Sequence, residues 1–282
     1  MCPRSDHHAI VPGGSGARAA RGSGLSEGLA TLAHRCDLVA FLVVRELKVR
    51  YRRSTLGLLW TMLQPLLSML VLTAVFSTAF GSAIERYPVY AITGILFWNL
   101  FQQSVVSSMY SLRGNAQILQ KLPVPRPVFP IATVLAGVVN LALALVPLLV
   151  VLVLTGSRLT WALVFLPVSI AVAALFVLGA GLLLAPLAVF FTDVVEMTAV
   201  ALSLLLYLTP VFYPVSIVPE RVSWLVRLNP LRWILEVFRD PIYHGRVPAP
   251  GHLIGAVAVA LLALAVGAAA FRRSSDRIPL YL

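Results

Sequence analysis

The densest positive charge in this 282-residue sequence lies in one short segment, RELKVRYRRSTLGLLW, at residues 45–60. Guanidinium groups pair with phosphate oxygens, and each base near anionic lipid contributes about 1 kcal/mol of attraction. Two interpretations stay open: the cluster only anchors and orients the chain at a membrane surface, or its arginines also attract a phosphate-bearing ligand. The five basic residues are Arg45, Lys48, Arg50, Arg52 and Arg53.

Aromatic residues form a second candidate set. On a helix, Tyr90, Phe97 and Phe101 would share one face, with Trp98 beside them. Aromatic side chains either pack in a core or an interfacial belt, or present flat apolar faces along a pathway. Both interpretations stay open for the whole set: Trp60, Tyr90, Phe97, Trp98, Phe101, Tyr207, Phe212 and Tyr213.

The composition indicates that membrane-spanning helices hold these residues. The chain is 59% hydrophobic and 12% charged, with a mean hydropathy of +0.91, whereas soluble domains have about 25% charged residues. The sequence therefore predicts an all-α integral membrane protein. A spanning helix needs about 20 apolar residues. Six stretches qualify: about 56–80, 89–112, 128–155, 161–191, 194–212 and 252–271.

Three further segments complete the predicted organisation. Residues 1–35, rich in Gly, Ser, Ala and Arg, read as a disordered cytoplasmic arm. Residues 38–54 are predicted to form an amphipathic interface helix, although the alternation within 47–52 also suits a strand. Residues 217–245 carry two short apolar helical patterns separated by the Asn-Pro pair at 229–230, which predicts re-entrant or interfacial helices on the outer side. In the second pattern the apolar residues follow the helical spacing i, i+3, i+4, i+7: Leu231, Ile234, Leu235 and Phe238.

The distribution of Lys and Arg predicts the orientation. With six spans and the N-terminus inside, 15 of these bases lie in cytoplasmic segments and 7 in outer segments. Cytoplasmic loops of membrane proteins carry an excess of Lys and Arg. Both termini are therefore expected in the cytoplasm.

Polar residues inside the predicted spans argue against coupling to an ion gradient. Ion-coupled carriers place ionisable groups within their spans, and the centres of these six spans have none. The span residues that can hydrogen-bond are neutral, and their ordinary role is to bond helix to helix. They include Gln64, Asn99, Gln102, Gln103 and Asn140.

No sequence motif supplies an internal energy source. The sequence lacks the phosphate-binding pattern GxxxxGK[ST], and neither lysine follows a glycine. It also lacks metal-ligand spacing and a Ser-His-Asp constellation, so we expect no metal and no cofactor on this chain. If the chain transports, another polypeptide must drive it from the cytoplasmic side. The polar segment 113–129, RGNAQILQKLPVPRPVF, is either the contact for that partner or a spacer.

Several stretches resemble a known family. RELKVRYRRSTLGLLWTMLQPLLSMLVLTAVFSTAFG is similar to the start of the permease subunits of type-2 ATP-binding-cassette exporters. Further matches are ILQKLPVPRPVFP after the second span, and LTPVFYPVSIVP and NPLRWILEVFRD after the fifth. The resemblance covers about residues 36–282, which would be the transmembrane domain. It is strongest to the branch that exports lipid-linked polysaccharides, including O-antigen, teichoic acid and galactan.

The resemblance implies an assembly and roles for the candidate residues. It implies a homodimer of permeases in the bacterial plasma membrane, with two ATPase subunits below that bind ATP and magnesium, and no nucleic acid partner. The basic cluster would then receive a polyprenyl pyrophosphate, and the selected aromatics would line a channel suited to sugar rings. The predicted ATPase contact is Gln117, Ile118, Leu119, Gln120 and Lys121.

Two other functions remain as alternatives. One is a permease for a drug or small lipid within the same superfamily. The other is a membrane-embedded glycosyl or lipid transferase, against which the spans offer no carboxylate to act as a general base or to hold a metal.

Overall fold

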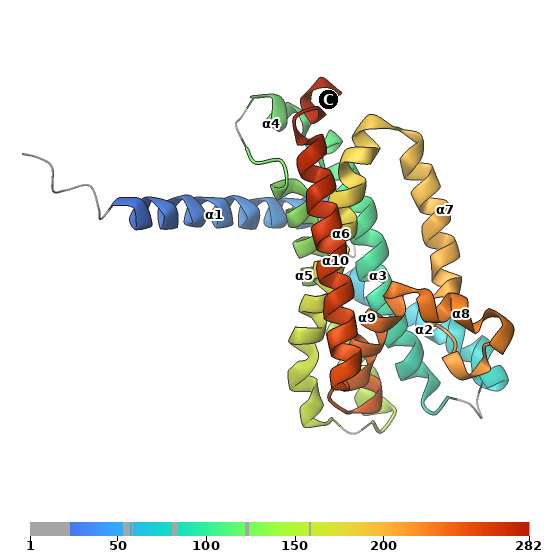
Figure 1. Ribbon diagram of the computed structural model, residues 1–282. Helices are drawn as coiled ribbons and strands as arrows, with labels where there is room; N and C mark the ends of the chain where they lie inside the picture. The colour runs from blue at the N-terminus through green and yellow to red at the C-terminus, as the bar shows by residue number, and fades with distance from the viewer. Residues whose placement is uncertain are drawn as a thin grey trace, which may run out of the picture. The chain divides into compact units, whose positions relative to one another are not determined.

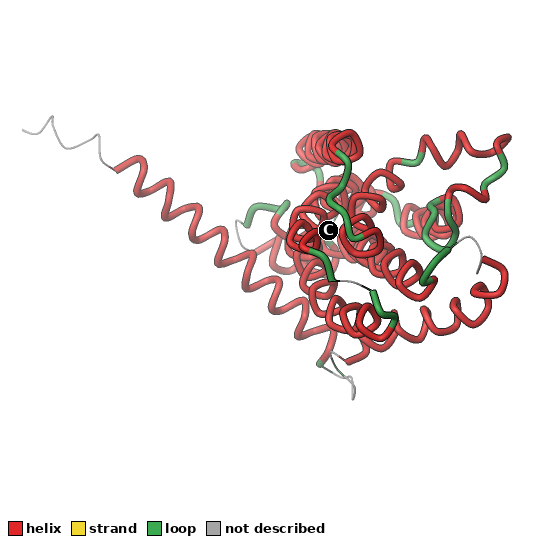
Figure 2. Tube along the Cα trace, turned by 90° about the horizontal axis from the view of Figure 1, so that it is seen from below, coloured by secondary structure: helices red, strands yellow, loops and turns green. Residues whose placement is uncertain are grey.

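The fold is entirely helical wherever the structure describes it. The computed structural model describes residues 23–52, 57, 59–80, 84–121, 124–157 and 159–281, and no strand occurs among them (Figure 2). The predicted all-α class is confirmed. The alternating stretch 47–52 is therefore not a strand, because its first five residues continue the helix α1 (Ser23–Tyr51).

The N-terminal helix begins earlier than the sequence predicted. We expected an interface helix over 38–54 after a disordered arm, whereas α1 starts at Ser23. Residues 23–35 of the predicted arm are thus helical, while residues 1–22 lie outside the described residues. The chain divides after Leu38 into two compact units, and the second unit, which begins at Val39, holds the five long helices.

Five segments among the described residues are long and apolar enough to cross a membrane. Their mean hydropathy comes from unbroken runs of Leu, Val, Ala and Ile, and each covers most of a predicted span. One of them joins a short 3₁₀ turn, η2 (Trp161–Phe165), to α6. The five main helices are α2 (Leu59–Phe80), α3 (Tyr87–Ser111), α5 (Val128–Leu154), α6 (Leu166–Phe190) and α10 (Pro250–Ser275) (Figure 1).

The predicted span 194–212 is a shorter helix than expected. α7 (Asp193–Leu208) has 16 residues, or about 24 Å of helix, against the ~30 Å of a hydrocarbon core. It ends because Thr209 adopts an extended conformation, and the Thr209 hydroxyl donates to the carbonyl of Leu205 at 2.7 Å. The chain therefore leaves the helix before the predicted end.

Two short helices precede the last span, as the broken pattern predicted. α8 (Glu220–Leu228) and α9 (Pro230–Arg239) meet at Asn229, whose side chain accepts a hydrogen bond from the Leu231 amide at 3.0 Å and so caps α9. Proline at the first position of α9 fits a helix start. The buried side of α9 carries the predicted i, i+3, i+4, i+7 set: Leu231, Ile234, Leu235 and Phe238.

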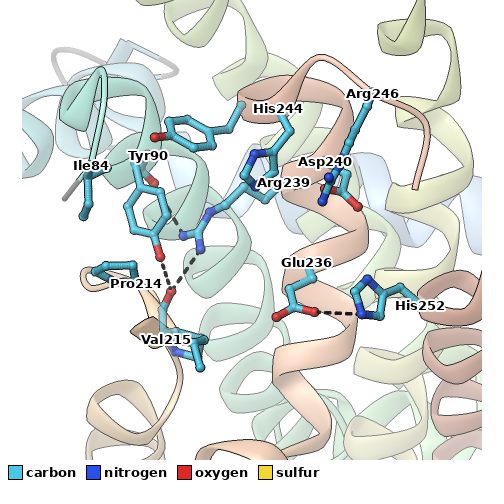
Figure 3. Close-up of a pocket in the computed structure, with 12 residues that line it drawn as sticks. Ile84, Tyr90, Pro214, Val215, Glu236, Arg239, Asp240, His244, Arg246 and His252 are labelled. Atoms are coloured by element: carbon cyan, nitrogen blue, oxygen red, sulfur yellow. Dashed lines mark hydrogen bonds and ion pairs between the residues drawn. The ribbon is translucent and has the colours of Figure 1, made fainter. Parts of the chain in front are cut away.

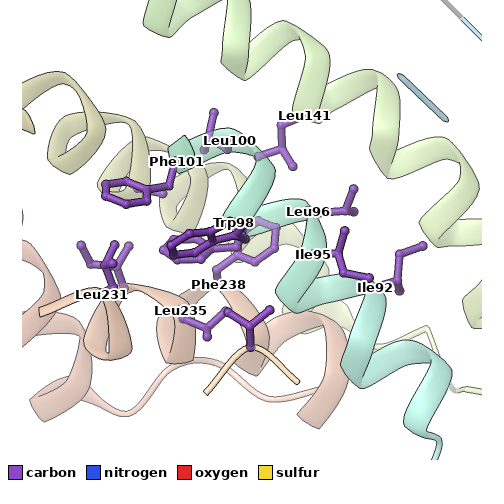
Figure 4. Packing of buried hydrophobic residues seen from close by; sticks show 14 of the residues in the cluster. Ile92, Ile95, Leu96, Trp98, Leu100, Phe101, Leu141, Leu231, Leu235 and Phe238 are labelled. Atoms are coloured by element: carbon purple, nitrogen blue, oxygen red, sulfur yellow. The ribbon is translucent and has the colours of Figure 1, made fainter. Parts of the chain in front are cut away.

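α3 is the centre of the bundle. It packs against α2, α5, α6 and α9, and it is the most buried of the five long helices. Figure 4 shows its residues Ile95, Trp98 and Phe101 near Leu235 and Phe238 of α9. This core fixes α9 in place beside α3.

Short helical turns join the main helices. α4 and the last described residue lie at the same end of the bundle (Figure 1). At that end the guanidinium of Arg126 donates to the carbonyl of Ser275, which links the start of α5 to the end of α10. The connecting elements are η1 (Arg113–Asn115), α4 (Ala116–Lys121), η3 (Val215–Ile217), η4 (Asp240–His244) and η5 (Ile278–Leu280).

Candidate functional site

The structure separates the basic cluster into different roles. Arg45 donates to the side-chain oxygen Oδ1 of Asn115 at 2.5 Å, which links α1 to the turn before α4. Arg50 instead reaches α3, where it donates to Gln103 at 3.3 Å and to Ser107 at 3.2 Å. Lys48 and Arg52 are exposed, and Arg53 lies outside the described residues. Arg45 and Arg50 of the basic cluster therefore contact different elements.

The end of α1 is also fastened to the span helices. The hydroxyl of Tyr51 donates to the side-chain oxygen Oδ1 of Asn140 on α5 at 2.8 Å. The same hydroxyl lies 3.1 Å from the hydroxyl of Thr61 on α2. These bonds hold the backbone on which Arg50 sits. Arg50 is thus positioned at the α3 surface by its own hydrogen bonds and by its neighbour.

An open groove begins at Arg50 and follows α2 and α3. Its first part has a volume of about 430 Å³ and is lined mainly by amides and hydroxyls. Its second part has a volume of about 510 Å³ and is more apolar, with Leu67, Val71 and Phe212 among its lining residues. Both parts share Asn99 and Gln102. We name the two parts together the amide groove, after its polar lining: Gln64, Asn99, Gln102, Gln103 and Ser107.

The groove amides are partly fixed by neighbours. The indole N–H of Trp98 donates to the Gln102 carbonyl oxygen at 2.8 Å, which leaves the NH₂ group of Gln102 available to a ligand. Gln103 accepts from Arg50, so its orientation is set from the other side. Sequence reasoning found these residues but assigned them only to helix–helix bonding. It could not place them together, because two helices contribute to the groove.

Half of the eight selected aromatics are buried in the core of this one chain. Phe97 and Phe101 are 1% and 5% exposed, and their ring centroids lie 6.1 Å from Phe238 and 5.8 Å from Phe176. Both were predicted to line a channel. Their burial corrects that prediction in favour of packing, because they have almost no surface to offer a ligand.

The remaining aromatics divide between the groove and the outer surface of the bundle. Trp98 is largely buried but contributes an edge to the amide groove, and half-buried Phe212 lines it too. Trp60 and Tyr207 are exposed, and half-buried Tyr213 donates through its hydroxyl to the Tyr207 carbonyl at 2.7 Å. Tyr90 is buried and belongs to a different cavity.

That second cavity lies around a buried arginine that sequence reasoning missed. Arg239 is 4% exposed and donates to the carbonyls of Pro210 and Val211, both at 3.0 Å. Its guanidinium carbon stands 3.8 Å from the centre of the Tyr90 ring, a cation–π contact. The only hint in the sequence was a charged residue at the end of the apolar face of α9.

We name this space the Arg239 cavity; its volume is about 320 Å³. Figure 3 shows Glu236, Asp240 and His252 around it. Burial raises the pKa of Tyr243 and lowers the pKa of His244, so both lining side chains are neutral near pH 7. The cavity therefore combines neutral rings with a few fixed charges.

The predicted ATPase contact is a surface helix. Of α4, Gln117, Gln120 and Lys121 are exposed, and Ile118 and Leu119 are half-buried. No residue of α4 is buried. The side chains are therefore accessible to a partner at this end of the bundle, and the contact itself stays a prediction.

The fold is that of a multi-pass membrane protein, with an open groove along α2 and α3. The sequence pattern of the ABC-2 type transporter family matches residues 37–243, and the chain belongs to this family. It is a membrane-spanning transport subunit, and ATP hydrolysis belongs to a separate protein. Its place is a bacterial inner membrane.

Individual relatives support the same family. The chain is 32% identical over 229 residues to the O-antigen export system permease protein RfbA of Myxococcus xanthus, covering 80% of this chain and 88% of the relative. It is 30% identical over 215 residues to the RfbA protein of Klebsiella pneumoniae, covering 76% and 83%. It is 23% identical over 245 residues to the polysialic acid transport protein KpsM of Escherichia coli, covering 84% and 93%.

Proposed function

We propose that this chain is the permease of an ATP-driven exporter that moves a polysaccharide from the cytoplasm to the outer side of the membrane. The amide groove carries the proposal. Primary amides both donate and accept hydrogen bonds, as sugar hydroxyls do, and they carry no charge. The names of the relatives, which export O-antigen and polysialic acid, point the same way.

The groove also supports a homodimer. Gln64 and Gln102 are exposed on the bundle surface, although both lie within membrane-spanning helices. An unpaired amide in hydrocarbon costs several kcal/mol, so lipid is a poor environment for this face. A second copy of the chain placed across the groove would enclose it as a water-filled pathway.

A lipid carrier would enter at the cytoplasmic end of the groove. We propose a polyprenyl pyrophosphate carrier, bearing a glycan of the O-antigen, teichoic acid or galactan type. Arg50 stands at the groove mouth, and exposed Lys48 and Arg52 add charge near it. Guanidinium groups suit pyrophosphate oxygens. This arrangement requires cytoplasmic termini, as the Lys and Arg distribution predicts.

The ATPase would act through α4. We propose that two ATPase subunits, each with its own ATP and magnesium, dock on residues 117–121 of the two permeases. α4 follows Asn115, which Arg45 of α1 contacts directly. Motion of the ATPase would thereby reach the helix that carries the groove mouth.

The apolar second part of the groove favours a competing substrate. Leu67, Val71 and Phe212 would also suit a drug or a small lipid. Such a substrate would depend on these apolar residues more than on the amides. Export of a polysaccharide would therefore depend on Gln102 and Gln103, whereas export of a drug or small lipid would depend on them little.

The test replaces two amide side chains of the groove by leucine, an apolar side chain of similar size. The double variant Gln102→Leu and Gln103→Leu should reduce surface polysaccharide at least about tenfold, because each lost hydrogen bond is worth about 1 kcal/mol. Surface polymer is measured with a glycan-specific antibody or lectin, and assembly by co-purification of the ATPase. Ser203→Ala, on exposed α7, is the control for removal of a polar group outside the groove. Normal export with normal assembly in the double variant would contradict the proposal.

A further inference from the structure

The Arg239 cavity lies next to the far end of the amide groove. Phe212 lines the groove, whereas Pro210, Pro214 and Val215 line the cavity. The segment 209–215 therefore forms a wall shared by both spaces. Arg239 holds this wall by its bonds to the carbonyls of residues 210 and 211.

The wall is held from α3 as well. The Tyr90 hydroxyl donates to the Tyr213 carbonyl at 2.8 Å, and the Tyr87 hydroxyl donates to the Phe212 carbonyl at 3.2 Å. The backbone between groove and cavity is thus fixed by several side chains. A rigid, pre-formed cavity binds a ligand without first paying for its own ordering.

Asp240, which lines this cavity, has one carboxylate oxygen without a hydrogen-bond partner among the described residues. Asp240 is 2% exposed, and its Oδ1 accepts a hydrogen bond from Arg246 at 3.0 Å. Its Oδ2 is buried and has no hydrogen-bond partner among the described residues. An unsatisfied buried acceptor is unfavourable, so this oxygen requires a donor such as a hydroxyl group.

The charges of the cavity favour a neutral ligand. The carboxylates Glu236 and Asp240 are balanced by the guanidinium groups of Arg239 and Arg246. Glu236 is already engaged, since Arg232 lies 2.7 Å from one oxygen and His252 3.8 Å from the other. A bound anion would therefore lie near the carboxylates as well as the guanidinium groups, and a bound cation near the guanidinium groups as well as the carboxylates.

The other walls favour a ligand with both apolar and polar faces. Tyr243, Ile84 and Pro214 offer apolar surface, and the volume of about 320 Å³ is at the lower end of small-ligand sites. A pyranose ring has an apolar face of C–H groups and a rim of hydroxyls. It matches both the ring surfaces and the orphan acceptor.

We propose that the Arg239 cavity binds one neutral sugar unit of the exported polymer as it leaves the amide groove, with Asp240 Oδ2 accepting a sugar hydroxyl. The inference rests on the proposed function and adds a second sugar site at the outer end. A sugar held there would oppose backward movement of the chain while the pathway resets.

The test uses the complete permease–ATPase complex in lipid nanodiscs with D-galactose, D-glucose and D-mannose as probes. Trp233 serves as the reporter, because its ring lies 5.5 Å from the ring of His252, which lines the cavity. We expect saturable binding of at least one sugar near ~1 mM, an affinity normal for a single small ligand. Saturation-transfer NMR provides an independent measurement.

Two variants and one control distinguish the site from other parts of the complex. Asp240→Asn removes the charged acceptor and should weaken binding about tenfold or more. Val215→Phe should block the cavity by volume and leaves the Asp240–Arg246 pair intact, so one variant remains informative if the other fails to fold. Asp193→Asn makes the same chemical change at an exposed site on α7 and should have no effect.

Failure of this inference differs from failure of the proposed function. If no sugar binds saturably, or if both variants bind as well as the unaltered complex, the cavity holds only water and the inference is overturned. The proposed function would still stand if the Gln102 and Gln103 variant lost export. Loss of sugar binding in Val215→Phe together with normal export by the groove variant would overturn the proposed function instead.

Discussion

The contact between α6 and α10 yields a quantitative prediction. These two helices make the most extensive helix–helix contact among the described residues, and they approach closely at Gly179 and Gly267. A Cβ placed at Gly179 would stand 2.5 Å from the backbone nitrogen of Leu264, whereas ordinary contact begins at 3.4 Å. The atoms that this Cβ would meet belong to the backbone of α10, so no side chain can move aside to make room. Gly179→Ala therefore requires the helices to separate by about 1 Å.

The magnitude follows from this separation. A gap of up to ~1 Å forfeits a quarter to a half of each dispersion contact, and overpacking of a core costs about 1–3 kcal/mol. Because the contact is extensive, we expect Gly179→Ala to lose about 3 kcal/mol. For a chain of this size that corresponds to a fall in Tm of about 5–10 °C. Thermal unfolding of the purified complex in nanodiscs, followed by circular dichroism, measures it.

Gly251→Ala is the matched control. Gly251 lies in the first turn of α10, and a Cβ there meets no atom within 4 Å. This control should leave Tm unchanged or raise it slightly, since alanine favours a helix by up to about 1 kcal/mol. The reasoning is refuted if Gly179→Ala unfolds at the same temperature as Gly251→Ala.

Three further predictions concern single contacts. Asn229→Ala removes the cap of α9 and should lower stability by about 1–2 kcal/mol in thermal unfolding, whereas Asn229→Ser, which keeps a capping oxygen but loses the amide donor to Thr209, should lose less; equal losses would argue against the cap. Arg45→Gln removes the charged bond to Asn115 and should reduce export per ATP hydrolysed several-fold, with Arg273→Gln, at an exposed position in α10, as the control; an unchanged ratio rejects this coupling. Lys121→Glu should reduce co-purified ATPase about tenfold, and full recovery of the ATPase would place its contact elsewhere.

The parts of the fold that the sequence predicted are those governed by local periodicity. Long apolar runs identified the five long membrane helices, and the spacing of Leu231, Ile234, Leu235 and Phe238 identified the buried side of α9. The Asn-Pro pair at 229–230 correctly separated α8 from α9. In each case the signal lies within about ten residues of the feature it specifies.

The parts that were missed depend on which helices meet. Shared spacing put Phe97 and Phe101 on one face of α3, but only packing against α9 and α6 buries that face. The end of α7 depends on the extended conformation of Thr209, whose hydroxyl also accepts a bond from Asn229 at 2.8 Å, twenty residues away. Neither contact leaves a signal in the local pattern.

The Arg239 cavity was missed for the same reason. Its lining comes from α3, the segment 209–215, α9, η4 and the start of α10. Arginine at the end of an amphipathic helix ordinarily faces solvent. Arg239 is buried here because the backbone carbonyls of Pro210 and Val211 accept its hydrogen bonds. No residue type near Arg239 in the sequence indicates that these carbonyls lie beside it.

We propose that the exported polymer passes along the amide groove. A photo-crosslinking amino acid at Asn99, which both parts of the groove share, tests it most directly in cells that export. We expect crosslinks between Asn99 and glycan that require an ATPase able to hydrolyse ATP. The same group at Met197, exposed on α7, should crosslink only lipid. Glycan crosslinks absent at Asn99, or equal at Met197 and Asn99, would contradict it.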